Sequence, residues 1–420
     1  MTNQQTTENI TITTLSNGVR VVSETVPYVQ TVALGLWVGT GSRDEAAPMR
    51  GISHFIEHML FKGTAKRNAR EIADSIESRG GHLNAFTGKE TTCYEARVLS
   101  EDLPLALDVL TDMFRNSLFD AVEMEREKRV VIEEIKMYED TPEDHVHDLF
   151  EQTLWTTHPL GKTIIGSEKT VSGLTPQNLK DYMTTHYCPE RILVVAVGNL
   201  EHEVLVGLCE AALGDMQGSP PKRSLKPAKP SGKSKKLRKR DTEQVHFCLG
   251  TAGYSKFQNE RFSLSILNNV LGGNMSSRLF QEIREKRGLA YAIGSYARTY
   301  LDGGHFCIYG GTSPETYGEV LDLIRIESER ILQSGISEEE LTKAKTQIRG
   351  ALVLGLEGMS SRMNRYADSL LAFERVIPIE EVLASYNAVS HESIGEVAQR
   401  VLLPDTQTLT AIGALPRQTE

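Results

Sequence analysis

The chain repeats its own plan, and this duplication limits the possible folds more than any other feature. Residues 249–253 repeat the pattern of residues 38–41, and residues 412–415 repeat that of residues 197–200. The two members of each pair occupy equivalent positions in the series of strand-like and helix-like segments in the two halves of the chain. We infer a duplicated unit of about 200 residues, because one core rarely serves a chain of 420 residues.

Local patterns in each half alternate between strand-like and helix-like runs. Residues 10–40 alternate apolar and polar side chains around an Asn17-Gly18 turn, which predicts a strand meander. We expect helices at 68–79, 101–117, 120–139, 175–186 and within 314–357, and strands at 82–87, 91–99, 192–197, 243–252, 289–311 and 408–412. Hairpin-linked strands followed by helices are typical of an α+β domain whose sheet is mostly antiparallel.

The composition changes abruptly between Gln217 and Arg240, where Ser, Pro, Lys and Arg dominate. Such a segment cannot supply a core, and it predicts an exposed basic linker. We therefore expect an N-terminal domain at 1–216, a linker at 217–240 and a homologous C-terminal domain at 241–420. The alternative is that the basic charges form a docking patch for an acidic partner.

The overall composition, 40% apolar and 24% charged, is that of an ordinary globular protein. A net charge of -10 argues against nucleic acid as a partner and fits an acidic interior that attracts cationic peptides. The longest apolar runs are strand-sized, so no membrane insertion is expected. The five widely spaced cysteines indicate reduced thiols. Together with a polar start that lacks a secretory or organellar signal, they predict a cytoplasmic location.

The segment 51–61 carries the clearest chemical motif, His54-x-x-Glu57-His58. If Ser53 caps a helix here, the two histidines leave the same helix face one turn apart. Both imidazoles can then bind one ion, and Glu57 can reach a water held by it, as in a metal-activated hydrolase. This residue order is the inverse of the commoner zincin motif. The alternative is a buried helix with two hydrogen-bonded core histidines.

A catalytic zinc normally takes three protein ligands, so the two histidines need a partner. The helix expected at 120–139 offers Glu133 and Glu134. Glu133 has Arg129 and Lys136 three or four positions away, whereas the corresponding neighbours of Glu134 are apolar. These apolar neighbours are Val130, Val131, Met137 and Tyr138. Because an inward carboxylate is costly without a cation, we predict Glu134 as the ligand and Glu133 as a surface residue.

Glu127 lies seven residues before Glu134 and therefore on the same face of that helix. A carboxylate in this position can orient a ligating histidine or steer the attacking water. A surface ion pair is the alternative role for Glu127, and helical spacing does not decide between the two.

His54, Glu57, His58 and Glu134 together resemble the active-site signature of the insulinase/pitrilysin family of inverted zincins. Over nearly its whole length the chain looks like the bacterial proteins related to the β subunit of the mitochondrial processing peptidase. The resemblance implies a zinc metalloendopeptidase that cuts unfolded peptides inside a hollow two-subunit clamshell. A homodimer would suffice, and some relatives form a heterodimer with a related subunit instead.

A second signature, Arg284 to Tyr291, contains Gly288 as a helix C-terminal residue. From the residues alone, Arg284 is a solvated helix charge and Tyr291 the edge of a core. The family resemblance instead implies that both contact the substrate carbonyl, where a guanidinium and a phenol can stabilise an oxyanion. It also implies that the pair of one subunit serves the zinc of its partner.

The resemblance further implies substrate-binding residues, which are Asn84, Ala85, Phe86, Phe61, Asp144 and Asp148. The first three match an edge strand that takes the peptide as an added strand. Phe61 matches the wall of the pocket for the residue after the cut, and the two aspartates match residues that read a substrate arginine. The alternatives are an edge strand without a ligand and an exposed acidic loop.

These assignments predict one mechanism, in which Glu57 takes a proton from the attacking water and passes it to the leaving amine. The rival function is a non-catalytic structural or assembly subunit, like the family members that have lost catalysis. Such members usually carry eroded motifs, whereas this chain keeps every expected residue. A third possibility is a maturation peptidase for one small peptide-derived cofactor.

Overall fold

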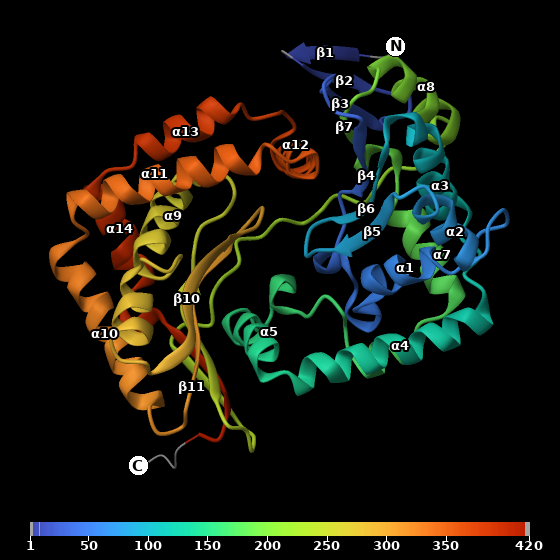
Figure 1. Cartoon of the computed structure of the whole chain (residues 1–420). Coiled ribbons are helices and arrows are strands. Elements are labelled where there is room, and N and C mark those ends of the chain that lie inside the picture. The colour runs from blue at the N-terminus through green and yellow to red at the C-terminus, as the bar shows by residue number, and fades with distance from the viewer. Residues whose placement is uncertain (1–2, 8, 416–420) are drawn as a thin grey trace. The chain divides into compact units, whose positions relative to one another are not determined.

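The computed structural model describes residues 3–7 and 9–415, which divide into two compact units (Figure 1). The first unit contains the described residues up to Ile135, together with Thr163–Arg223 and Leu354–Val376. The second contains Lys136–Lys162, Ser224–Val353 and the described residues from Ile377 onward. The boundaries predicted at 216 and 241 do not coincide with these units, because each half of the chain gives one helix to the unit of the other half.

The sheet of the first unit has seven strands in the order β1-β2-β3-β7-β4-β6-β5. Among the described strands of this sheet, only β3 and β7 pair in parallel, so the predicted, mostly antiparallel sheet is confirmed. The strands are Asn3–Thr7 (β1), Ile10–Thr14 (β2), Arg20–Thr25 (β3), Thr31–Val38 (β4), His82–Thr87 (β5), Thr92–Leu99 (β6) and Ile192–Gly198 (β7). β5 is an edge strand, which leaves one side of its backbone open.

Helices cover both faces of this sheet. They are Ile52–Leu60 (α1), Ala69–Glu77 (α2), Leu103–Asn116 (α3), Ala121–Asp140 (α4), Glu168–Ser172 (α6), Pro176–His186 (α7), His202–Leu213 (α8) and Met359–Phe373 (α12). Residues of α1, α3 and α8 share one apolar core with one face of the sheet. On the other face, Tyr366 and Leu370 of α12 pack in a cluster with Trp37 and Val195.

In the described part of the second unit, the sheet has five strands in the order β10-β11-β9-β12-β8, of which only β12 and β8 pair in parallel. They are Ser234–Lys239 (β8), Val245–Ala252 (β9), Ala290–Thr299 (β10), Gly304–Thr312 (β11) and Thr408–Gly413 (β12). β8 lies inside the predicted linker, so that prediction is wrong at 234–239. An edge strand tolerates this basic sequence, because Lys235 and Lys236 stay exposed while Leu237 packs against the core.

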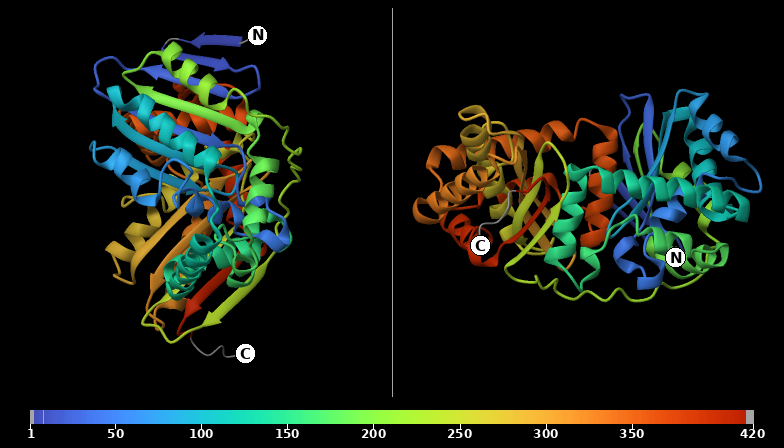
Figure 2. Two further views of the ribbon diagram at one scale, coloured as in Figure 1. Left: turned by 90° about the vertical axis from the view of Figure 1, so that its right-hand side faces the viewer. Right: turned by 90° about the horizontal axis from the view of Figure 1, so that it is seen from below.

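The helices of the second unit follow the same plan (Figure 2). They are Pro142–Leu154 (α5), Glu260–Leu271 (α9), Tyr317–Ser334 (α10), Glu338–Gly355 (α11), Ile379–Asn387 (α13) and His391–Val401 (α14). Residues of α9, α10 and α14 form the core on one face of the sheet. Val146 and Phe150 of α5 pack with Cys248 and Ile412 on the other.

The two halves therefore exchange equivalent helices. α5 is the third helix in the series α3-α4-α5, and α12 is the third in α10-α11-α12. Each covers the sheet built mainly from the other half of the chain. This reciprocity confirms the duplication that the repeated sequence pattern predicts. Within the described residues, no helix has the length and apolar character needed to cross a membrane.

Candidate metal centre

The metal-motif helix α1 begins differently from the prediction. Its N-cap is Gly51, at a φ of +93° that favours glycine, and Ser53 lies inside the helix with its hydroxyl 3.0 Å from that of Tyr182. The backbone amides of Gly51 and Ser53 instead donate to the Glu45 carboxylate, at 2.8 and 2.9 Å. A carboxylate from an earlier loop thus satisfies the first amides of α1, as a capping side chain would.

The structure brings His54, His58 and Glu134 together. The Nε2 atoms of His54 and His58 lie 3.8 and 3.7 Å from Oε2 of Glu134, and the two ring centroids are 4.5 Å apart. Two ligand atoms of one tetrahedral zinc ion are separated by about 3.3 Å, given zinc–ligand distances near 2 Å. A small contraction of this cluster would place all three donors around one ion.

The electrostatics of the three side chains fit a cation. Oε2 of Glu134 is buried, and no described residue gives it a hydrogen bond. Burial, and then the neighbouring His58, lower the pKa of His54 to about 4, so its imidazole is neutral with a free lone pair. A buried acceptor without a donor is costly, and a divalent ion at this point would remove that cost.

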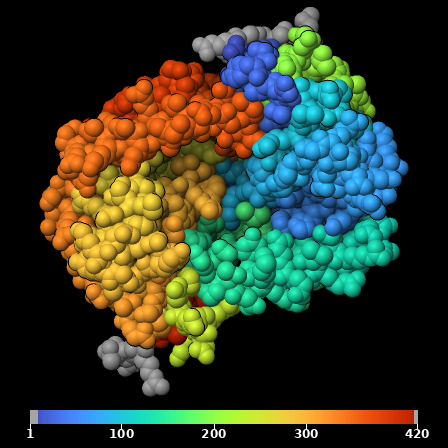
Figure 3. All heavy atoms as spheres, in the orientation of Figure 1, coloured from blue at the N-terminus to red at the C-terminus, as the bar shows by residue number. Residues whose placement is uncertain are grey.

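The geometry agrees with the prediction of Glu134 over Glu133 as the ligand. The supporting argument, that the apolar neighbours of Glu134 mark a buried face, is partly wrong. Three of the four apolar neighbours used in that argument, Val130, Met137 and Tyr138, are 52%, 59% and 42% exposed. They lie on the surface of α4. The atoms of this part of the chain are teal in Figure 3. The buried residues of α4 are Met124, Glu127, Lys128, Val131 and Ile135. Glu134 borders this stripe beside Glu127 and Val131, whereas Glu133 is exposed.

Glu127 is buried against the metal-motif helix, so the alternative of a surface ion pair is wrong for this residue. One carboxylate oxygen lies 2.8 Å from Nδ1 of His58, and the other lies 2.7 Å from Nζ of Lys62. Burial alone would raise the pKa of Glu127, but the hydrogen bonds from His58 and Lys62 outweigh it and lower that pKa. Glu127 therefore stays ionised and can orient His58.

Glu57 points toward the edge strand β5, where the Thr87 hydroxyl donates to its Oε2 at 2.5 Å. Burial raises the pKa of Glu57, although the bond from Thr87 and the charge of His58 oppose the rise. A carboxyl with a raised pKa accepts a proton more readily than an ordinary carboxyl does and can still return it. Glu57 thus has the environment that a general base needs.

Arg284 and Tyr291 meet within the second unit. A π-helical turn, Phe280–Glu285, carries Arg284, and Gly288 ends it at a φ of +66°. Arg284 Nη1 donates to the Tyr291 carbonyl at 2.8 Å, and its guanidinium lies 4.8 Å from the Tyr291 ring centroid. Tyr291 is 77% exposed, so the interpretation of this residue as a core edge is wrong. The pair forms an exposed group of hydrogen-bond donors.

The residues assigned to substrate binding lie in both units. Asn84, Ala85 and Phe86 are on β5, with the Phe86 side chain 40% exposed, and Phe61 follows α1 and packs against the core of the first unit. In the second unit, Asp144 and Asp148 are one turn apart on α5, so the alternative of an acidic loop is wrong there.

Three residues beside the metal ligands were not predicted from the sequence, namely Glu45, Lys62 and Thr87. Lys62 lies four residues after His58, a helical spacing that could have identified it as a partner for Glu127. Thr87 directly follows the Asn84-Ala85-Phe86 stretch. Its contact with Glu57 depends on how β5 packs against α1, and no local sequence pattern reports that packing.

Two imidazoles and a carboxylate on an α+β scaffold, with a further glutamate beside them, point to the inverted-zincin class of metallohydrolases. The chain belongs to the insulinase family, peptidase family M16. The family model described as insulinase matches residues 20–168, which include His54, Glu57, His58 and Glu134. A second model, described as the peptidase M16 inactive domain, matches residues 173–348.

Curated relatives extend over nearly the full chain. An uncharacterized zinc protease of Bacillus subtilis is 43% identical over 93% of this chain and 95% of the relative. Another from Streptomyces coelicolor is 40% identical, covering 96% of this chain and 89% of the relative. These names agree with a zinc peptidase of this family.

Solved structures show the same fold. A peptidase M16 inactive domain from Pseudomonas fluorescens superposes with a TM-score of 0.90 at 20% identity, covering 98% of this chain and 99% of the other. A protease from Helicobacter pylori gives a TM-score of 0.89 at 22% identity, with 98% and 100% covered. At these identities the similarity supports the fold alone.

Proposed function

We propose that this protein is a zinc metalloendopeptidase in which His54, His58 and Glu134 hold the ion and Glu57 is the general base. The convergence of the His54 and His58 Nε2 atoms on the buried Oε2 of Glu134, which accepts no hydrogen bond from any described residue, carries this proposal. Zinc in such a site would polarise the peptide carbonyl and lower the pKa of the attacking water.

The chain's own residues would then move the proton. Glu57, held by Thr87, accepts a proton from the water and delivers it to the leaving nitrogen of the peptide. Glu127 and Lys62 keep the His58 ring oriented throughout. The raised pKa of Glu57 supports this double role, because a strongly acidic carboxyl would return the proton poorly.

We extend the proposal to a homodimer in which Arg284 and Tyr291 of one subunit stabilise the oxyanion at the zinc site of the other. The exposure of Tyr291 and its contact with Arg284 support this role, since an exposed pair of donors is available to a partner. A heterodimer with a related subunit is the alternative arrangement.

The proposed substrates are unfolded peptides or presequence-like segments. β5 is the edge of its sheet and carries Thr87, which contacts Glu57, so a peptide added along β5 would run beside the general base. We assign Asp144 and Asp148 to a basic residue near the cut and Phe61 to the residue after it. Enrichment of basic residues at cleavage sites in a peptide library, measured by mass spectrometry, tests the aspartate assignment.

The decisive experiment is Glu57→Gln, assayed with a quenched fluorescent peptide with and without chelator. We expect the variant to keep its zinc and to lose turnover by about 10²- to 10⁴-fold, because only the proton acceptor is removed. Glu133→Gln is the matched control, and normal turnover is expected for it. Normal turnover by Glu57→Gln would contradict the role of the base, and a wild type without chelator-sensitive activity would favour a non-catalytic subunit.

A further inference from the structure

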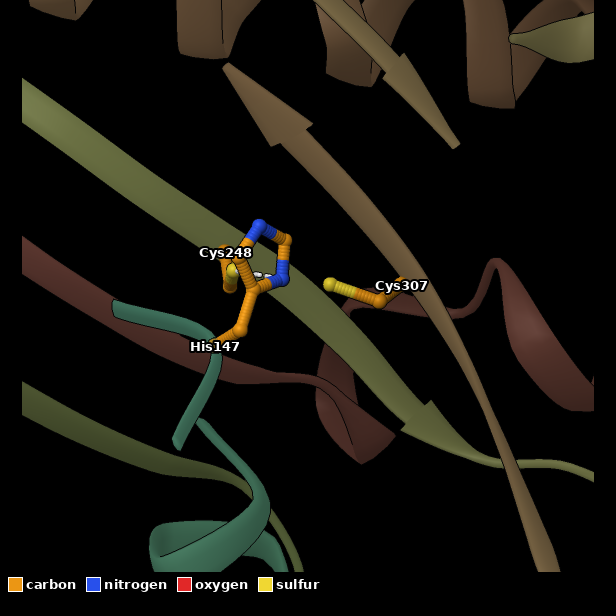
Figure 4. Close-up of side chains that lie close together, drawn as sticks. All are labelled: His147, Cys248 and Cys307. Carbon is orange, nitrogen blue, oxygen red and sulfur yellow. Dashed lines mark hydrogen bonds between the residues drawn. The ribbon is translucent and has the colours of Figure 1, made fainter. Parts of the chain in front are cut away.

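A second group of metal-binding side chains lies in the second unit. Among the described residues, His147, Cys248 and Cys307 place their donor atoms within 4.8 Å of one another. His147 comes from α5, Cys248 from β9 and Cys307 from β11, and all three meet where α5 covers the sheet (Figure 4). Nδ1 of His147 lies 3.4 Å from the Cys248 sulfur, and the Cys307 sulfur points toward the same ring.

The register of the sheet explains why the two thiols converge. Cys248 pairs with Tyr309, and Cys307 pairs with Gly250 across the same two strands. Because side chains alternate along a strand, both cysteines lie on the face that α5 covers. Tyr296 pairs with Cys307 from the next strand, and its hydroxyl lies 2.8 Å from Nδ1 of His147.

This register disfavours a disulfide between the cysteines. They are diagonal neighbours in the antiparallel pair, and the Cα atoms of such neighbours are about 7–8 Å apart. A disulfide normally requires Cα atoms within roughly 4.4–6.8 Å. A metal ion can join two sulfurs that a covalent bond cannot reach, since each zinc–sulfur bond is about 2.3 Å long.

The donor set also selects a class of ion. Both cysteines are fully buried, and the site lies among apolar residues of α5 and the sheet. Two thiolates and a neutral imidazole would balance a divalent cation, leaving no net charge in this core. Thiolates with an imidazole suit zinc and other thiophilic ions and do not suit magnesium or calcium.

We propose that His147, Cys248 and Cys307 form a second metal site, separate from the proposed catalytic centre, that binds a thiophilic cation such as Zn²⁺. The Tyr296 hydroxyl, 2.8 Å from Nδ1 of His147, is in place to supply a fourth ligand atom, an oxygen. The ion would join a helix from the first half of the chain to the sheet of the second unit. We assign it a structural role, because its donors come from packed elements and both cysteine side chains are fully buried.

Cobalt substitution tests this site independently of peptidase activity. Thiolate ligands give Co²⁺ an intense near-ultraviolet charge-transfer absorption, which a site of two histidines and a glutamate cannot produce. We expect this absorption in the metal-free full-length protein reconstituted with Co²⁺, and equally in His58→Ala. It should disappear in the Cys248→Ser, Cys307→Ser double variant, and this variant should bind one ion fewer per chain than the wild type.

Cys209→Ser is the matched control, because Cys209 is also buried but lies in α8 of the first unit. The absorption should be unchanged in that variant. If the double variant does not fold, the titration of His58→Ala still decides, since its absorption must saturate at one ion per chain with the intensity of two thiolates. Absence of the absorption in the wild type would overturn the proposal, as would its survival in a folded double variant or alkylation mapping that finds Cys248 bonded to Cys307.

Discussion

The carboxylate of Glu127 lies 2.8 Å from Nδ1 of His58, while Nε2 of the same ring faces Glu134 at 3.7 Å. An ionised carboxylate can only accept, so the proton of a neutral His58 lies on Nδ1 and the lone pair on Nε2. Glu127 thereby selects the tautomer that a metal ligand needs. Lys62 holds the other oxygen of Glu127 at 2.7 Å and fixes the carboxylate in turn.

Glu127→Gln should therefore weaken zinc binding by about 10- to 100-fold, as is usual when a ligand's hydrogen-bond partner is removed. The amide keeps the shape of the side chain but not the charge that favours the Nδ1 proton. Competition with a chromophoric chelator measures the affinity. Glu133→Gln, an exposed position on the same helix, should bind zinc as the wild type does. Equal affinities for the two variants would rule out the orienting role.

Thr87→Val should shift the pH dependence of kcat/KM. The Thr87 hydroxyl donates to Glu57 and so opposes the rise in the pKa of Glu57 that burial causes. Valine removes this bond, so the pKa rises further and the acidic limb of the profile moves to higher pH, by roughly one pH unit. Thr87→Ser keeps the hydroxyl and should leave the limb in place. A valine variant with the wild-type profile would show that this bond does not tune the base.

The buried carboxyl of Glu45 should make the stability of the folded protein depend on pH. Burial raises its pKa to about 8, despite the two amides of α1 that donate to it. Because the unfolded chain releases this proton near pH 4.5, ionisation favours unfolding as the pH rises from there to about 8. Glu45→Gln cannot titrate. Urea unfolding measures the free energy of unfolding at pH 5 and at pH 8. Between these pH values the wild type should lose more of this free energy than the variant, by a few kcal/mol, which is the order expected from the shift in the Glu45 pKa. Identical losses would contradict the raised pKa.

Much of the fold follows from local sequence signals. The turn at Asn17-Gly18, the Thr175-Pro176 start of α7 and the Gly288 helix end each act over a few residues. The exchange of α5 and α12 was not predictable in this way, because both helices carry ordinary amphipathic patterns. Which sheet a helix covers depends on contacts between segments far apart in the chain, and one sequence does not report them.

The candidate site shows the same limit. His54, Glu57 and His58 lie within one helix, so their relation follows from helical spacing alone. Glu134 was predicted as the ligand because its helical neighbours are apolar, yet most of those neighbours are exposed. Apolar residues also occur on the surfaces of helices, so apolar neighbours alone do not identify a buried face. Ser53 is a residue type common at helix N-caps, but the N-cap is Gly51, and Glu45 accepts from the amides of Gly51 and Ser53 from outside the helix. Helical spacing therefore cannot predict contacts between residues that are far apart in the sequence.

The proposed dimer leads to a test by complementation. Glu57→Gln removes the base, and Tyr291→Phe removes one of the proposed oxyanion donors. If each active site combines the zinc ligands of one subunit with Arg284 and Tyr291 of the other, a mixed dimer of the two variants contains one intact site and one doubly defective site. Each variant alone should be nearly inactive.

Random exchange of subunits in an equal mixture makes half of the dimers mixed. Because one of their two sites is intact, activity should recover to about one quarter of the wild-type value. Covalent labelling of the two variants with a fluorophore pair verifies that exchange has occurred. Tyr291→Phe mixed with wild type serves as the control for exchange alone. If verified mixed dimers stay as inactive as the parent variants, Tyr291 acts within its own chain, and the shared-site arrangement is wrong.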